Sequence, residues 1–259
     1  MKKTNIIVFG MCLSLVTCAS SQKKFQMAKE KDPQYQYSMG AVYLNNNNLD
    51  EAVRFFNKAL SLDPRHYQSL NALGLVHSMK GDLREAEKSF LKCLGVSPNF
   101  MEAHNNLGMI YQEMGFLDKA EEEFKRVITD PTYASKELAY YNLARLYTMR
   151  QNWETALFYA DKAIQANARY HLGHGLRGYI LENQDKLPEA IESYKQAVKL
   201  LPVDVAYSFN LAAAYFKNGD FRQAGEILGN ILPLITEPEM KEKANSYLKT
   251  IKEKEKQGV

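Results

Sequence analysis

The chain has 259 residues, of which 46% are hydrophobic and 24% are charged, values close to the averages of soluble globular proteins. Its 33 basic and 30 acidic residues give a net charge of +3, and no basic stripe runs along the sequence. This balance argues against a nucleic-acid-binding protein, because such proteins concentrate positive charge where they meet the phosphates.

The first predicted segment is a leader. Lys2 and Lys3 precede an apolar stretch from Ile6 to Val16 that is broken only by small residues. A positively charged start followed by an apolar run of this length is typical of a secretory signal peptide. The run is too short to remain as a membrane-spanning helix.

The leader ends in the sequence LVTC at residues 15–18, which is followed by the small polar sequence ASSQ. This end resembles the bacterial lipobox, although Thr17 stands where Gly or Ala is more usual. The resemblance implies a lipoprotein signal peptide over residues 1–17, an acylated Cys18 that carries palmitate, and a tether over residues 18–32. Several acyl chains would make the anchor stable, because one chain binds a membrane only marginally. The alternatives are an ordinary signal peptide with a chance cysteine, or an uncleaved anchor.

The cysteines fit this interpretation. Cys12 would leave with the leader and Cys18 would be acylated, so that Cys93 would remain alone. A single thiol cannot form an internal disulfide, although a secreted protein meets an oxidising compartment. We therefore expect Cys93 to be buried.

The rest of the chain is repetitive. A small residue recurs at intervals of 34 residues, with one interval of 36, at Gly40, Gly74, Gly108, Ala144, Gly178 and Ala212. Each is followed twelve residues later by an alanine, namely Ala52, Ala86, Ala120, Ala156, Ala190 and Ala224. Four residues further on stand Phe56, Phe90, Phe124, Ala160, Tyr194 and Leu228. This spacing resembles the tetratricopeptide repeat, a helix–turn–helix unit of 34 residues.

The resemblance implies an all-α fold, an α-solenoid wound into a right-handed superhelix of six helix–turn–helix repeats with a C-terminal capping helix. The expected repeats span residues 33–66, 67–100, 101–136, 137–170, 171–204 and 205–238. A capping helix and tail are expected over 239–259, because Met240, Ala244, Leu248 and Ile251 recur there at helical spacing among many Lys and Glu residues. Glycines in three of the turns are expected to adopt a left-handed conformation that ends the first helix: Gly81, Gly115 and Gly219. Cys93 occupies the small packing position that alanine fills in other repeats. Repeat four departs most, because it lacks the aromatic residue at Ala160 and follows a two-residue expansion around residues 130–133.

The sequence offers little for catalysis. His171 and His174 stand three residues apart on one expected helix, a spacing that could share a metal ion. No carboxylate or cysteine is in register to complete that site, and His174 also falls on a packing position. No catalytic or phosphate-binding motif is present. We therefore expect no enzyme, no metal and no cofactor.

The binding surface is predicted from the resemblance. In tetratricopeptide proteins a few positions of each first helix line a concave groove that holds a protein partner. The matching residues are Tyr37, Leu44, Asn71, Leu75, Met79, Asn105, Met109, Tyr141, Arg145, Met149, Tyr179, Phe209 and Phe216. Tyr, Phe and Met favour interface cores and suit a peptide ligand. Alternatively, several of these residues only pack against neighbouring helices. Arg145 stands almost alone as a basic residue, so the carboxylate clamp of cytosolic co-chaperones is not expected.

A lipidated chain of six such repeats resembles the type IV pilus biogenesis lipoproteins, the PilF/PilW pilotin family. The long junction at Asp130 to Tyr133, followed by the sequence YYNLA, also resembles that family. The resemblance implies a monomer on the periplasmic face of the outer membrane of a Gram-negative bacterium, to which Ala19 after the cysteine is suited. Its repeats would bind the secretin subunit and assist secretin assembly. The alternative is a general periplasmic adaptor that docks peptidoglycan hydrolases or polysaccharide-export components.

Overall fold

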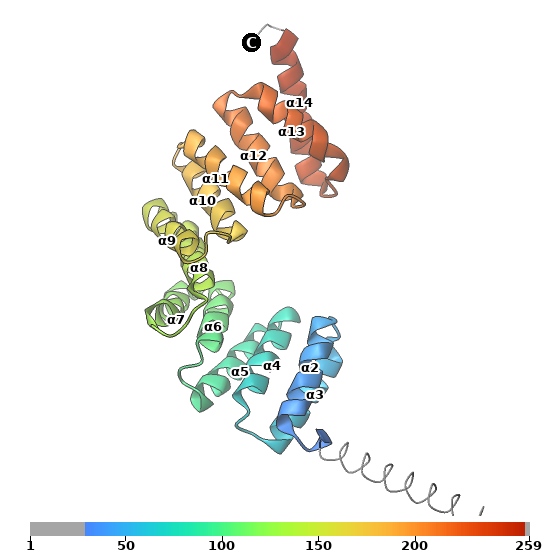
Figure 1. Cartoon of the computed structure of the whole chain (residues 1–259), viewed down its shortest axis with the longest axis vertical. Coiled ribbons are helices and arrows are strands. Elements are labelled where there is room, and N and C mark those ends of the chain that lie inside the picture. Colours follow the sequence, from blue (N-terminus) through green and yellow to red (C-terminus); the bar gives the residue numbers. More distant parts are fainter. Residues whose placement is uncertain (1–28, 257–259) are drawn as a thin grey trace, which may run out of the picture. The chain divides into compact units, whose positions relative to one another are not determined.

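The structure is a computed structural model that describes residues 29–256. Within this range every regular element is helical, and the contacts divide the chain into two compact units at Phe116 and Leu117 (Figure 1). Unit 1 contains α2 (Pro33–Asn45), α3 (Leu49–Leu62), α4 (Tyr67–Met79), α5 (Leu83–Val96) and α6 (Met101–Glu113). Unit 2 contains α7 (Leu117–Thr129), α8 (Lys136–Met149), α9 (Trp153–Ala166), α10 (His171–Asn183), α11 (Leu187–Leu200), α12 (Val205–Asn218), α13 (Phe221–Ile231), the 3₁₀ helix η1 (Leu232–Leu234) and α14 (Pro238–Lys256). The predicted all-α fold of repeated helix pairs is confirmed.

The turn inside each helix pair has the same backbone geometry in all six repeats. One residue at the same repeat position has a positive φ, namely Asn47, Gly81, Gly115, Gln151, Asp185 or Gly219. The left-handed conformation predicted for the three glycines is therefore confirmed. The other three turns place residues with side chains in a conformation that glycine adopts at lower cost.

Side chains form hydrogen bonds that cap the first turn of several helices. Asn48 Oδ1 accepts a hydrogen bond from the backbone N–H of Glu51 at 3.4 Å, and Asn152 does the same for Thr155 at 3.1 Å. Asp204 accepts bonds from two backbone N–H groups at the start of α12. Such caps satisfy donors that have no partner inside the helix, and each contributes about 1 kcal/mol.

Inside a pair, the small residue of the first helix lies against the large residue of the second. A Cβ atom added to Gly74 would lie 2.5 Å from a ring carbon of Phe90, and one added to Gly178 would lie 2.6 Å from the ring of Tyr194. Both rings are buried. Glycine is therefore required wherever the second helix supplies an aromatic ring at this position.

In repeats one, three and five the fourth residue is bonded to the turn that precedes it. The side chains of Gln36, His104 and His174 each hydrogen-bond a backbone carbonyl oxygen six residues earlier, at 2.8, 2.8 and 3.0 Å. His104 and His174 thus have the packing role that the sequence allowed for His174. These bonds hold the start of the first helix against the preceding turn.

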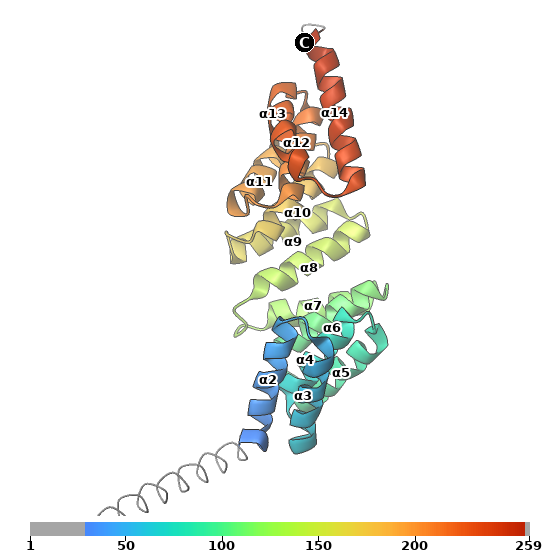
Figure 2. The same cartoon turned by 90° about the vertical axis from the view of Figure 1, so that its right-hand side faces the viewer.

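In unit 2, α14 lies beside α13 and also contacts α12 (Figure 2). Ala244 and Ile251 are buried against a cluster that includes Leu228 and Ile231, and Met240 and Leu248 pack partly against it. The other side of α14 is rich in exposed lysine and glutamate. The predicted cap therefore covers the apolar side of the last repeat.

Cys93 is fully buried as a free thiol, as predicted. Its Sγ donates a hydrogen bond to the backbone oxygen of Tyr67 at 3.2 Å. Burial raises the pKa of the Cys93 thiol to about 12. The leader and Cys18 lie outside the described residues. None of the helices in residues 29–256 has the length and apolar character needed to cross a membrane.

Candidate binding surface

The residues predicted to contact a partner all lie on the first helix of a pair. Within each unit these first helices contact one another, α2 with α4, α4 with α6, and α8 with α10. The unit 1 face is the surface formed by Tyr37, Leu44, Asn71, Leu75, Met79, Asn105 and Met109. The unit 2 face is the surface formed by Leu138, Tyr141, Arg145, Met149, Tyr179, Phe209 and Phe216, of which Leu138 was absent from the sequence prediction.

The unit 1 face carries no charged residue. The amide side chains of this face point into the protein rather than toward a ligand. Asn71 Oδ1 accepts a hydrogen bond from Asn106 Nδ2 at 3.1 Å, and Asn105 is buried. Met79 is 55% exposed and Met109 is 41% exposed. The accessible part of this face is therefore flexible, apolar and polarisable, a composition that adapts to different ligands.

Tyr37 of α2 packs against His66, the residue that caps the start of α4. The Tyr37 ring lies between Phe56 and His66, with centroid distances of 5.9 and 5.5 Å. His66 Nδ1 is hydrogen-bonded to Ser69 Oγ at 2.9 Å. Burial lowers the pKa of His66, although nearby carboxylates oppose this shift. Tyr37 thus contributes to packing as well as to the face.

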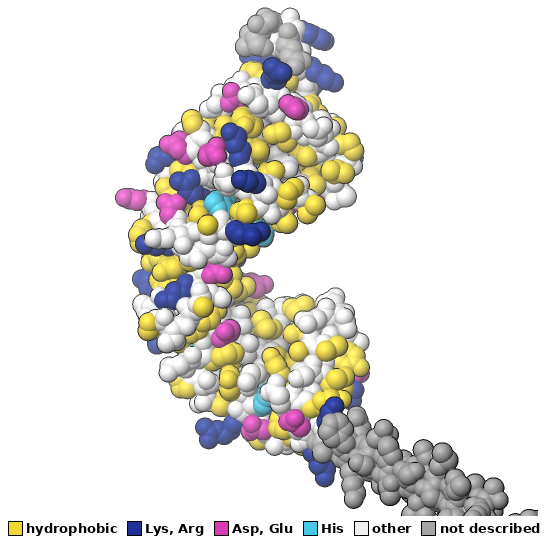
Figure 3. Space-filling model, in the orientation of Figure 1, with side chains coloured by type: hydrophobic (Ala, Val, Ile, Leu, Met, Phe, Trp, Pro, Cys, Tyr) yellow, Lys and Arg dark blue, Asp and Glu magenta, His cyan; other side chains and the backbone are white. Residues whose placement is uncertain are grey.

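Hydrophobic side chains reach the surface of both units (Figure 3). On the unit 2 face Met149 is 54% exposed and Tyr179 is 46% exposed. The Arg145 guanidinium lies 5.9 Å from the centroid of the Tyr141 ring, a distance suited to a cation–π contact. This face therefore combines one cation with aromatic and apolar side chains.

A group of rings that extends from Tyr141 of this face was not predicted from the sequence. Tyr141 lies edge-on to Tyr170 with a centroid distance of 5.6 Å, and His171 Nδ1 is hydrogen-bonded to Tyr207 Oη at 3.0 Å. We call these four residues the tyrosine cluster. A Cβ atom added to Gly175 would lie 2.5 Å from the Tyr207 ring, so this glycine makes room for the cluster.

The phenols of the tyrosine cluster remain neutral donors at neutral pH. Burial raises the pKa of Tyr141 and Tyr170, and it raises the pKa of Tyr207 to about 12. The Tyr170 hydroxyl is buried and has no hydrogen-bond partner within the described residues. An unsatisfied buried hydroxyl costs about 1–3 kcal/mol, so the cluster retains unused hydrogen-bonding capacity.

Phe209 and Phe216 are partly covered by α14. The Tyr247 ring lies 6.3 Å from the Phe209 ring and 4.4 Å from the Phe216 ring, stacked on both. Both phenylalanines are half-buried as a result. Their role in the cap was not apparent from the sequence, which placed them with the partner-binding residues.

The two histidines considered for a metal have separate partners. His171 bonds Tyr207, whereas His174 Nε2 bonds the backbone oxygen of Ala168. No three His, Cys, Asp or Glu side chains gather closely enough in residues 29–256 to hold a metal ion.

Charged side chains also line cavities outside the faces. In unit 2, Arg177 stands where five repeats have Leu or Met, and it donates to Asp161 at 2.7 Å and to Ser193 at 2.5 Å. Together with His174 these residues line a cavity of about 200 Å³.

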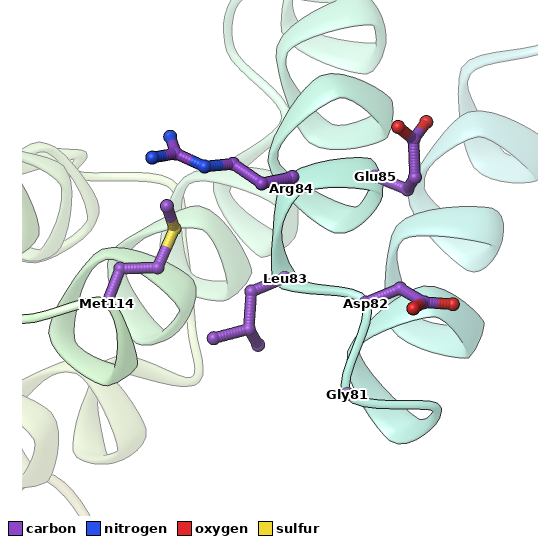
Figure 4. Close-up of a pocket in the computed structure, with 6 residues that line it drawn as sticks. All are labelled: Gly81, Asp82, Leu83, Arg84, Glu85 and Met114. Atoms are coloured by element: carbon purple, nitrogen blue, oxygen red, sulfur yellow. The ribbon is translucent and has the colours of Figure 1, made fainter.

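Another cavity lies in unit 1, at the start of α5, and measures about 390 Å³. The carboxylates of Asp82 and Glu85 point away from the Arg84 and Met114 side chains there (Figure 4). Arg84 pairs instead with Glu87 at 3.4 Å. In the unit 2 cavity Ser193 Oγ donates to the backbone oxygen of Glu189 at 2.9 Å, while His174 Nε2 bonds the backbone oxygen of Ala168.

Models of the tetratricopeptide repeat match residues 33–66, 55–88 and 102–129, and a model described as a TPR repeat matches residues 178–219. No curated protein sequence matches the chain. Among solved structures, PilF of Pseudomonas aeruginosa is similar with a TM-score of 0.75 and 16% identity, over 85% of this chain and 99% of that one.

PilW, described as a widely conserved type IV pilus biogenesis factor, is similar with a TM-score of 0.75 and 15% identity, over 82% of this chain and 97% of that one. YrrB, a TPR protein with an unusual peptide-binding site, has a TM-score of 0.55 and 17% identity, over 74% of this chain and 97% of that one. The helix pairs, the repeat models and these structural likenesses together show that the chain is a tetratricopeptide-repeat protein whose fold resembles that of PilF and PilW.

Proposed function

We propose that this protein is an outer-membrane lipoprotein that binds the secretin subunit of a type IV pilus system and assists secretin assembly. The observation that carries the proposal is the extent of the structural likeness, which covers 99% of PilF and 97% of PilW. A chain that merely shared a few repeats with those proteins would match a smaller part of them.

The mechanism needs no chemical step. The first-helix faces would hold a segment of the partner, and the acyl chains on Cys18 would attach the complex to the membrane. Tyr and Met on these faces supply large apolar contacts, which carry much of the energy of protein interfaces. Two or more acyl chains would make the attachment stable.

The test is made in the host, by deleting the gene and measuring detergent-resistant secretin multimers in the outer membrane. We expect the multimers to be lost, to return with the wild-type gene and to remain reduced with Cys18→Ala. Cys93→Ala is the matched control, because alanine fills the same repeat position at Ala59 and Ala163. It should restore the multimers fully.

Normal multimers and normal pili in the deletion strain would overturn the pilus role. In that case the same scaffold would serve another envelope system, such as peptidoglycan hydrolases or polysaccharide export. Crosslinking from exposed positions of the two faces, for example Met79 and Tyr179, would then identify the partner.

A further inference from the structure

Arg145 is the one charged side chain on the unit 2 face. It is exposed, and within the described residues its contact is with the Tyr141 ring rather than with a carboxylate. Nearby cations are used differently: Arg177 pairs with Asp161 at 2.7 Å and Lys217 pairs with Glu182 at 2.6 Å. The donors of Arg145 are therefore available to a ligand.

Apolar side chains lie on both sides of Arg145 along α8. Leu138 precedes it by seven residues and Met149 follows it by four, which correspond to about 10 Å and about 6 Å along the helix. Both are exposed. On the neighbouring α10, Tyr179 occupies the repeat position that Arg145 has on α8, and its ring lies 6.3 Å from Trp153.

This arrangement selects a ligand by its chemistry. A guanidinium offers a planar set of N–H donors that fits the two oxygens of a carboxylate, and such charge-assisted pairs are stronger than neutral hydrogen bonds. The flanking side chains would in turn be covered best by apolar residues of the same ligand. A charged or polar neighbour would lose hydration there without gaining a partner.

We propose that the unit 2 face binds a protein segment in which an acidic side chain has apolar residues on both sides. The carboxylate pairs with Arg145, and its neighbours cover Leu138 on one side and Met149 and Tyr179 on the other. This rests on the proposed function only in taking a first-helix face as the binding surface. A C-terminal carboxylate fits less well, because a chain that ended at Arg145 would leave one apolar side uncovered.

The first experiment uses random dodecapeptides displayed on phage through their carboxyl ends, so that no free C-terminal carboxylate is offered. They are selected on the full-length chain and on Arg145→Glu. We expect the wild type to enrich Asp or Glu flanked by apolar residues, and the variant to enrich Lys or Arg at that position. No acidic enrichment on the wild type, or the same enrichment on Arg145→Glu, would overturn the proposal.

The second experiment measures the affinity of one selected peptide by fluorescence anisotropy. Arg145→Gln should weaken binding about tenfold or more, since hydrogen bonds to charged groups are worth about 1.5–3 kcal/mol. Changing the peptide's acid to Gln should weaken it equally, and combining the two changes should cost little more. Arg222→Gln removes an exposed arginine from the second helix α13 and is the matched control. Equal affinities of Arg145→Gln and Arg222→Gln would contradict the proposal.

These results are independent of the secretin assay. If acidic peptides are selected while gene deletion leaves the secretin multimers intact, the ligand preference stands and the pilus role fails. If deletion abolishes the multimers while Arg145→Glu selects the same peptides as the wild type, the pilus role stands and the proposal for Arg145 fails. Arg145 is exposed, so Arg145→Glu and Arg145→Gln should both unfold at the same temperature as the wild type.

Discussion

At the scale of single residues, the size of one residue in the first helix depends on its partner in the second. Gly178 lies against Tyr194, whereas the corresponding pairs in repeats four and six combine alanine with Ala160 and with Leu228. Where the second helix supplies an aromatic ring, the first helix has glycine, because a packed interior does not tolerate overlap. Repeat four has small residues at both positions.

The first prediction follows from this matching. Gly178→Ala places a Cβ atom 2.6 Å from ring carbons of Tyr194, so it should lower the free energy of unfolding by about 1–3 kcal/mol. This loss should exceed the gain of about 1 kcal/mol that alanine gives in a helix interior. Denaturant unfolding can be followed through Trp153, the one tryptophan of the chain.

Gly229→Ala is the control, because a Cβ atom there meets nothing within 4 Å. It should raise the unfolding midpoint. Adding Tyr194→Leu to Gly178→Ala recreates the combination of Ala212 and Leu228 and should recover part of the loss. A Gly178→Ala variant as stable as Gly229→Ala would show that the ring moves aside freely.

The sequence shows both partners in one repeat at a fixed separation, but their contact became evident only from the structure. The tyrosine cluster was not predicted, because Tyr141 and Tyr170 of repeat four and Tyr207 of repeat six occupy three different repeat positions. Arg177 was equally difficult to interpret. Its departure from the leucine of other repeats is visible in the sequence, but its pairing with Asp161 depends on how neighbouring repeats pack.

At the scale of elements, the turn between the two helices of a pair imposes one backbone geometry on six different sequences. Gln151 has a φ of 56° and Asp185 a φ of 58°, while Gly219 has a φ of 88°. A left-handed residue with a side chain costs about 1–2 kcal/mol, less for Asn and Asp. Repeat four therefore carries the least suitable residue at this turn.

The second prediction concerns that turn. Gln151→Gly should raise the free energy of unfolding by about 0.5–1 kcal/mol, and with it the unfolding midpoint, because relief of the strained backbone exceeds the added entropy of the unfolded chain. Asn47→Gly should give a smaller gain, since Asn adopts this conformation more readily than Gln. Gly219→Ala should have the opposite sign. Thermal unfolding of the three variants measures the order of their midpoints. A lower midpoint for Gln151→Gly than for the wild type would contradict the prediction.

The capping helix illustrates what helical periodicity does and does not predict. The spacing of Met240, Ala244, Leu248 and Ile251 predicted an amphipathic helix that covers the last repeat, and the packing of α14 agrees. Its effect on the face was not predicted, although Tyr247 has the same helical spacing, three residues after Ala244 and four before Ile251, and it stacks on Phe209 and Phe216. Helical spacing indicates which side of α14 is buried, but not which residues of the other helices that side covers.

At the scale of the whole molecule, a chain of repeats gains its stability mostly between neighbours. Loss of one end should therefore affect the adjacent repeats first. In unit 2 the end is α14, which buries Ala244 and Ile251 against α12 and α13. The helices of unit 1 have no share in this cluster.

The third prediction is that a chain ended after Glu237 loses protection against hydrogen exchange in α12 and α13. Each large side chain uncovered should cost about 1.5–3 kcal/mol, and Phe216 loses the ring stacked on it at 4.4 Å. Protection in α2 to α5 should not change. A chain ended after Lys252 keeps Tyr247 and Ile251 and is the control. Unchanged protection of α12 in the shorter chain would show that α14 is dispensable.

The buried thiol of Cys93 has a practical consequence for chemical labelling. With a pKa of about 12, fewer than about one thiol in ten thousand is ionised at pH 7.5, and the thiolate is the reactive form. Cys93 is the one cysteine beyond residue 18. In a mature chain whose Cys18 is acylated, a cysteine introduced at Met79 or Tyr179 would react with a maleimide dye or spin label while the native thiol stays silent. Such a mature chain would provide an almost cysteine-free background for spectroscopy without any alteration of its core.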